Sequence, residues 1–165
     1  RGDDPYRHAN KFSVGLFTGH YGYNPAAGME ITTPAFREHF SIRFRGSLQG
    51  LEVYKSYRGH WISYQSFSAG ITYHSRISES ARFFVEAGGI FIIPDSRFSD
   101  ETFLKGYYEF NGLEITLLAG NDYTLCLYLG IGPAFIKASA EKIEGNPRYG
   151  NGLHFVNGVR IYFGK

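Results

Sequence analysis

Residues 36–46, FREHFSIRFRG, alternate bulky apolar side chains with cationic and polar ones. The apolar positions are Phe36, Phe40, Ile42 and Phe44, and the intervening positions are Arg37, His39, Ser41, Arg43 and Arg45, with Glu38 on the apolar side. Successive side chains of a strand point to opposite faces, so this segment predicts a strand with one apolar and one cationic face. The rest of the chain has to provide different surroundings for each face.

Similar alternating segments recur along the whole chain, and turn residues separate them. The expected strands cover residues 11–21, 34–46, 51–57, 61–74, 82–92, 107–119, 123–138 and 152–163. The composition agrees, because 18% aromatic residues suit pleated surfaces and 21 glycines suit turns and crowded strand positions. The sequence predicts one all-β domain over residues 1–165, with residues 1–10 as a flexible N-terminal segment.

Short and long connections are expected to alternate between these strands. The short ones are GSLQG at 46–50, SRISESA at 75–81 and GND at 120–122. The long ones are YNPAAGMEITTP at 23–34, PDSRFSDETFLKGYY at 94–108 and SAEKIEGNPRYG at 139–150. This alternation is typical of an antiparallel up-and-down meander with tight turns at one end and loops at the other.

The length of the strands and the position of the aromatic residues favour a membrane barrel. Several expected strands have 11 to 16 residues, which exceeds the usual globular strand of about 5–6 and suffices for a tilted bilayer crossing. Aromatic residues of the apolar phase gather at both ends: Phe12, Phe44, Tyr73, Phe83, Tyr123 and Phe163 at the tight-turn end, and Tyr21, Phe36, Tyr57, Trp61 and Tyr107 or Tyr108 at the loop end. Two aromatic rings around an aliphatic middle indicate an eight-stranded transmembrane β-barrel whose apolar face meets lipid.

The opposite face then points into a lumen that eight strands leave only wide enough for side chains. The charged residues of this inward phase are Arg37, Arg43, Arg45, Glu52, Arg82, Glu86, Glu114 and Arg160. Buried charges need partners, so these residues are expected to form a luminal polar network. The cations outnumber the carboxylates, which predicts that tyrosine hydroxyls, water or further acids pair with the remainder.

The chain resembles the small eight-stranded barrels of the bacterial outer membrane, a group that includes the OmpA membrane domain, OmpX, the opacity proteins and the lipid A deacylase PagL. The resemblance lies in the meander, in RFFVEAGGIF (82–91) and LGIGPAF (129–135), and in the ending VNGVRIYFGK. It implies an outer-membrane location and an assembly signal at Gly158, Ile161 and Phe163. Val156, Gly164 and Lys165 depart from the usual pattern of that signal.

The same resemblance implies the partners of the chain. They are the lipid bilayer with its lipopolysaccharide, the barrel-assembly machinery during insertion, and a possible envelope protein partner. A formal charge of +2 without a basic run does not favour nucleic acid. The histidines show no metal-ligand spacing, and no motif calls for a cofactor.

Three functions compete at this stage. The first is an integral outer-membrane barrel with a non-catalytic structural, recognition or complex-subunit role. The second is a lipid A-modifying enzyme like PagL or PagP; in PagL-type enzymes a His-x-Ser pair shares one strand face, but His74 is followed directly by Ser75, so no catalytic residue is predicted. The third is a soluble lipocalin-like barrel that buries Phe36, Phe40 and Phe44 around a ligand and exposes the arginines.

Overall fold

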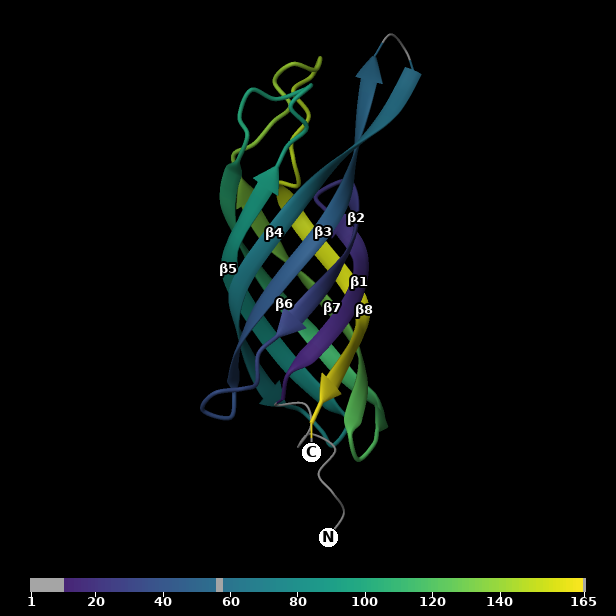
Figure 1. The fold of residues 1–165 in the computed structure, drawn as a ribbon, viewed down its shortest axis with the longest axis vertical. Coiled ribbons are helices and arrows are strands. Elements are labelled where there is room, and N and C mark those ends of the chain that lie inside the picture. The colour runs from purple at the N-terminus through teal and green to yellow at the C-terminus, as the bar shows by residue number, and fades with distance from the viewer. Residues whose placement is uncertain (1–10, 56–57, 165) are drawn as a thin grey trace.

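The computed structural model describes residues 11–55 and 58–164, so the predicted flexible segment 1–10 lies outside the described residues. The strands are β1 (Ser13–Tyr21), β2 (Asn24–Thr32), β3 (Phe40–Lys55), β4 (Arg58–Arg76), β5 (Ala81–Ile93), β6 (Leu104–Ala119), β7 (Tyr123–Ile136) and β8 (Gly152–Phe163). Each strand pairs antiparallel with the next, and β1 also pairs with β8, which closes the barrel (Figure 1). The predicted fold class, an eight-stranded antiparallel up-and-down barrel with a filled lumen, is confirmed. Within the described part of the chain, no helix is long and apolar enough to cross a membrane.

The structure has the expected number of strands, eight, but the prediction missed one strand and divided another into two. Residues 24–32, predicted to be part of a loop, form β2. The predicted strands 34–46 and 51–57 are one strand, β3, which runs through the expected turn GSLQG. Gly46 and Gly50 sit within this strand in register with β4, so they are small outward-facing residues and not turn residues.

The opening segment FREHFSIRFRG is a strand only from Phe40 onward. Arg37 and Glu38 have φ angles of 49° and 65°, in the left-handed region, and form a turn. This turn brings Phe36 opposite Phe40 in an isolated bridge. Residues 36–39 are therefore not part of a strand despite their alternating pattern, and Glu38 lies in the turn.

The two ends of the barrel differ. Connections 33–39, 77–80 and 120–122 lie at one end, called the turn end, where β1 begins and β8 finishes (Figure 1). Connections 94–103 and 137–151 lie at the other end, called the loop end. The β3–β4 hairpin projects beyond the barrel wall at the loop end, because β2 pairs with β3 only as far as Gln49 and β5 pairs with β4 only from Gln65.

The aromatic ends are partly as predicted. Phe12, Phe44, Tyr73, Tyr123 and Phe163 are exposed toward the turn end, as expected. At the loop end Trp61 and Tyr107 are exposed, whereas Tyr21 and Tyr108 are buried inside. Phe36 belongs to the turn end, since the strand that was expected to carry it begins only at Phe40, and Tyr57 lies outside the described residues.

Candidate functional site

The interior of the barrel holds a network of ion pairs. Its charged members are Glu30 from β2, Arg43 and Arg45 from β3, Arg82 and Glu86 from β5, Glu114 from β6 and Arg160 from β8, and each is 3% exposed or less. Charge alternates along an unbroken line of contacts in the order Arg43, Glu86, Arg45, Glu30, Arg160, Glu114, Arg82. The line crosses the lumen and connects five strands, β2, β3, β5, β6 and β8.

Glu86 is the centre of one half of this network. Its carboxylate accepts from Arg43 Nη1 at 2.7 Å, from Arg45 Nη2 at 2.9 Å and from the Tyr108 hydroxyl at 2.6 Å. Arg43 also donates through Nε to Thr32 Oγ1 at 2.9 Å. A carboxylate that accepts several charge-assisted hydrogen bonds can be buried without an uncompensated charge.

Glu114 plays the same part in the other half. It accepts from Arg82 and Arg160, and from the Tyr162 hydroxyl at 2.9 Å. The guanidinium of Arg160 also lies over the Tyr128 ring, 4.1 Å from its centroid. The tyrosines thus supply the hydroxyl partners and ring faces that an arginine-rich lumen needs.

Glu30 joins the two halves, and the sequence analysis of charged inward positions did not include it. Arg45 Nε donates to Glu30 Oε2 at 3.0 Å, and Arg160 Nε donates to Glu30 Oε1 at 2.6 Å. Glu30 was missed because residues 24–32 were expected to be loop. The alternation of Glu30 and Thr32 with Met29 and Ile31 was the available signal.

Two predicted members lie elsewhere. Arg37 is exposed in the turn 33–39, because the strand does not extend back to it. Glu52 is exposed on the β3–β4 hairpin, where β3 has moved beyond the barrel wall. The prediction placed Arg37 inside because it began the strand at residue 34. It placed Glu52 inside because it divided β3 into two strands, whereas Glu52 is in the outward phase of the continuous strand. The structure brings together Arg43, Arg45, Arg82, Glu86, Glu114 and Arg160, with Glu30 added.

The lumen above the network is filled by aromatic and aliphatic side chains. Tyr64 and Tyr149 meet edge to face with ring centroids 4.9 Å apart, and Asn24 Nδ2 donates to the Tyr64 hydroxyl at 2.6 Å. The connection 137–151 folds inward at this end and buries Ala138, Ala140 and Tyr149. The ionic centre is therefore covered from the loop end.

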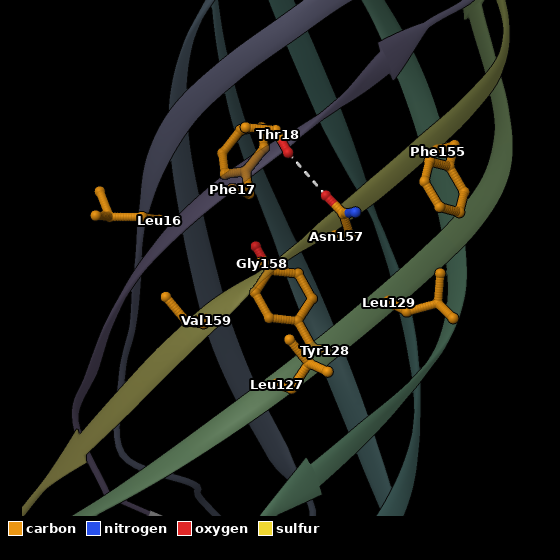
Figure 2. A pocket seen from close by; sticks show the side chains of 10 residues that line it. All are labelled: Leu16, Phe17, Thr18, Leu127, Tyr128, Leu129, Phe155, Asn157, Gly158 and Val159. Carbon is orange, nitrogen blue, oxygen red and sulfur yellow. Dashed lines mark hydrogen bonds between the residues drawn. The ribbon is translucent and has the colours of Figure 1, made fainter. Parts of the chain in front are cut away.

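The outer wall is largely apolar, as Figure 2 illustrates for β1, β7 and β8. Leu16, Leu127, Leu129 and Val159 point outward, with exposed fractions of 40–56%. Tyr128, in the inward phase of β7, is fully buried. Two polar pairs of described residues interrupt the outer wall. Thr18 Oγ1 donates to Asn157 Oδ1 at 2.8 Å beside a hollow of about 540 Å³. On the outer face of β6, Asn111 Nδ2 donates to Glu109 Oε1 at 3.3 Å.

This inside-out distribution contradicts the lipocalin-like alternative. That alternative required Phe44 in a dry interior and Arg43 in water, but Phe44 is 50% exposed and Arg43 is fully buried. The network would have no counterpart in such a barrel. The lipocalin-like arrangement, with an apolar interior and exposed arginines, is wrong.

A serine–histidine contact lies inside the turn end. Ser41 Oγ is 3.3 Å from His74 Nε2, both side chains are buried, and His74 Nδ1 has no hydrogen-bond partner among the described residues. His39 and Ser41 also have the His-x-Ser spacing, which the prediction overlooked, but His39 Nδ1 contacts the His74 carbonyl instead. A buried pair whose histidine has no orienting carboxylate does not make a nucleophilic triad.

No group of three or more histidine, cysteine or acidic side chains able to hold a metal ion occurs in the described part of the chain. Cys126 is buried and lies 3.8 Å from Thr116 Oγ1. It fills a small inward position of β7.

The two long connections of the loop end contact each other through Glu141. Its carboxylate accepts from the backbone N–H of Asp100 and from Ser99 Oγ at 2.9 Å. These hydrogen bonds, with the backbone bond of Asp100 the strongest influence, lower the pKa of Glu141. Connections 94–103 and 137–151 thus form one ordered surface.

The N-terminal β-barrel domain of Pseudomonas aeruginosa OprF superposes on this chain with a TM-score of 0.59, covering 93% of this chain and 98% of that domain at 13% identity. The two share a fold. The resemblance to small OmpA-like outer-membrane barrels is confirmed at the level of architecture. No protein-family model and no curated relative matches the sequence.

The residues of the suspected assembly signal lie on the last strand. Ile161 and Phe163 face outward on β8, whereas Gly158 is in the inward phase, beneath the Tyr128 ring. A Cβ at Gly158 would lie 2.2 Å from the carbonyl oxygen of Leu16 and 2.9 Å from Tyr128. Close packing of the seam between β1 and β8 therefore requires glycine at this position.

Proposed function

We propose that this protein is an integral protein of the bacterial outer membrane with a non-catalytic role, in which a sealed barrel anchors an ordered loop surface. The observation that carries the proposal is the combination of a largely apolar outer wall with an interior in which each buried charge of the network has an ion-pair partner. Water surrounds the outside of a soluble barrel and would favour the opposite arrangement. The OmpA-like fold supports the same location.

The two ends suggest the orientation. Barrels of this kind have short periplasmic turns and longer extracellular loops. The turn end would then face the periplasm, and connections 94–103 and 137–151 with the β3–β4 hairpin would face outward. These segments form the surface on which recognition or contact with another envelope protein would take place.

The role of Gly158, Ile161 and Phe163 in assembly is part of this proposal. The outward pair Ile161 and Phe163 lies on the last strand at the turn end, where the barrel-assembly machinery would meet the unfolded chain. Gly158→Ala is expected to impair closure of the β1–β8 seam when the purified protein folds. Phe163→Ala is expected to slow assembly in cells and to leave folding of the purified protein unchanged. Equal effects of both changes in both assays would contradict this division.

The test of the membrane location uses the only tryptophan, Trp61, which is 61% exposed near the loop end. The protein is folded into phosphatidylcholine vesicles that carry bromine at different acyl-chain depths. Quenching is expected to be strongest for bromine near the headgroups, together with a heat-modifiable gel band. A monodisperse protein that stays folded without detergent or lipid would overturn the proposal.

A further inference from the structure

The outer wall at the loop end has an apolar hollow of about 570 Å³ between β5, β6 and β7. Its sides are aromatic: Tyr107 stacks on Phe135 with ring centroids 4.9 Å apart, and Phe91, which also lines it, stacks on Phe103 at 5.3 Å. Apolar side chains dominate its surface. A hollow of this kind accepts a hydrocarbon chain.

Two lysines lie at the loop-end edge of this hollow. Gly106 pairs with Ile136 in the β6–β7 ladder, so the next positions along the same register are Lys105 and Lys137. Both side chains are exposed and line the hollow. Two ammonium groups that line one hollow repel each other, so this pair favours an anion between them.

A third cation continues the same surface away from the barrel. Residues Lys137, Ser139 and Arg148 line a polar hollow of about 390 Å³ that also includes Ile136 and Asn151 of the first hollow. The two hollows are therefore contiguous, one apolar and one basic.

The basic hollow is held in place by the fold of connection 137–151. Ser139 and Arg148 form an isolated antiparallel bridge, and Asn151 Oδ1 accepts from the backbone N–H of Ile136 at 2.8 Å. Burial of Ala138 and Tyr149 directs the alternate residues outward. The cations thus project from ordered backbone, which reduces the entropy cost of binding a ligand.

No carboxylate forms an ion pair with Lys105, Lys137 or Arg148 among the described residues. The acids near this surface have other partners, since Glu141 accepts from Ser99 and Asp100, and Asp100 pairs with Lys142. Three uncompensated cations beside an apolar hollow match an amphiphile with an anionic head.

We propose that this surface is a binding site for a membrane lipid with a phosphorylated, negatively charged headgroup. The acyl chain lies along Tyr107 and Phe135, and the phosphate lies against Lys105, Lys137, Arg148 and the Ser139 hydroxyl. This inference rests on the membrane location proposed above and names a specific lipid contact within it. The aromatic ring at the loop end would place the site at headgroup level.

The test uses nanodiscs that contain equal amounts of phosphatidylcholine and phosphatidylglycerol, from which the folded protein is released into the gas phase for native mass spectrometry. Wild-type protein is expected to retain phosphatidylglycerol in preference to phosphatidylcholine. Equal retention of the two lipids by inserted, heat-modifiable protein would overturn the lipid site alone. Failure to insert at all would instead contradict the proposed membrane location.

Variants locate the site. Each of the changes K105Q, K137Q and R148Q is expected to lower the preference about fivefold, and the triple variant about a hundredfold, since a basic group near an anionic lipid contributes about 1 kcal/mol. K142Q is the matched control, because it removes a loop-end cation that pairs with Asp100 away from the hollow. A loss with K142Q equal to that with K137Q would show general attraction and overturn the site. Displacement of the lipid by inorganic phosphate alone would overturn the need for an acyl chain.

Discussion

At the scale of single residues, Glu30 connects the two halves of the ionic network in the lumen. It is the only carboxylate that contacts arginines of both halves of the network described here, Arg45 and Arg160. Removing one partner of a buried ion pair leaves the other charges uncompensated. Loss of one charged residue of the network therefore destabilises the charged residues that contact it.

Glu30→Gln is expected to lower the free energy of unfolding by roughly 3–5 kcal/mol, because two buried guanidinium groups lose a shared negative partner. Urea unfolding in lipid vesicles measures the change. Glu52→Gln is the matched control: Glu52 is exposed, so a change within about 0.5 kcal/mol is expected. Similar losses for both variants would contradict the placement of Glu52 outside the network.

The fold requires a residue without a side chain at Gly132. A Cβ at this position would lie 1.8 Å from the carbonyl oxygen of Glu109 on β6. Gly132→Ala is expected to destabilise the barrel by about 3 kcal/mol or to reduce the folded fraction. Gly46→Ala, whose Cβ would meet nothing nearer than the Phe67 ring at 3.4 Å, is expected to be tolerated. A heat-modifiable gel shift after refolding compares the two variants, and equal yields would contradict the close approach.

At the scale of elements, the strands follow the alternation of side chains wherever the barrel wall is complete. In β7, inward Cys126 and Tyr128 are fully buried, while outward Leu127 and Leu129 are exposed, as the period of two predicts. The pattern was harder to recognise in β2, because outward Pro25 and Ala27 resemble loop residues. It was also misleading in β3, because glycine serves an outward strand position as readily as a turn.

The contact between the two long connections depends on pH. The pKa of Glu141 is lowered by its hydrogen bonds, so the ionised carboxylate stabilises the loop surface above the unfolded value of about 4.3, and this contribution is lost as the pH falls through the folded pKa. The Asp100 amide resonance, followed by NMR in micelles, is expected to shift with a midpoint below about 4.3. In Glu141→Gln this transition should disappear. A midpoint above 4.3 would contradict the contact.

At the scale of the whole molecule, the barrel has an ionic interior and an apolar exterior, so substitutions distinguish lipid from water around it. Leu129 lies midway along β7, and Tyr123 lies at its turn end. In a bilayer, Leu129→Arg is expected to cost about 2–4 kcal/mol and Tyr123→Arg about 0–1 kcal/mol. Unfolding in vesicles by urea measures both. If water surrounded the barrel, both changes would be nearly neutral, because both side chains are already exposed.

Sequence alone determined the class of fold, the up-and-down order of the strands and the two faces of most strands. These follow from a local period of two residues, which the chain displays without reference to distant segments. It also placed Arg43, Arg160 and Glu114 on the inward phase. It did not determine that residues 24–32 form a strand or where β3 begins.

Only the tertiary structure decided which charges meet. Arg160 and Glu30 are 130 positions apart in the sequence, and they come together because closure of β1 against β8 and the register of β2 bring both to one height of the lumen. The same holds for Lys105 and Lys137, which share a surface through the register of β6 and β7. Alternation is a local property, whereas register and closure depend on all strands together, and this is why the faces could be predicted and the ion pairs could not.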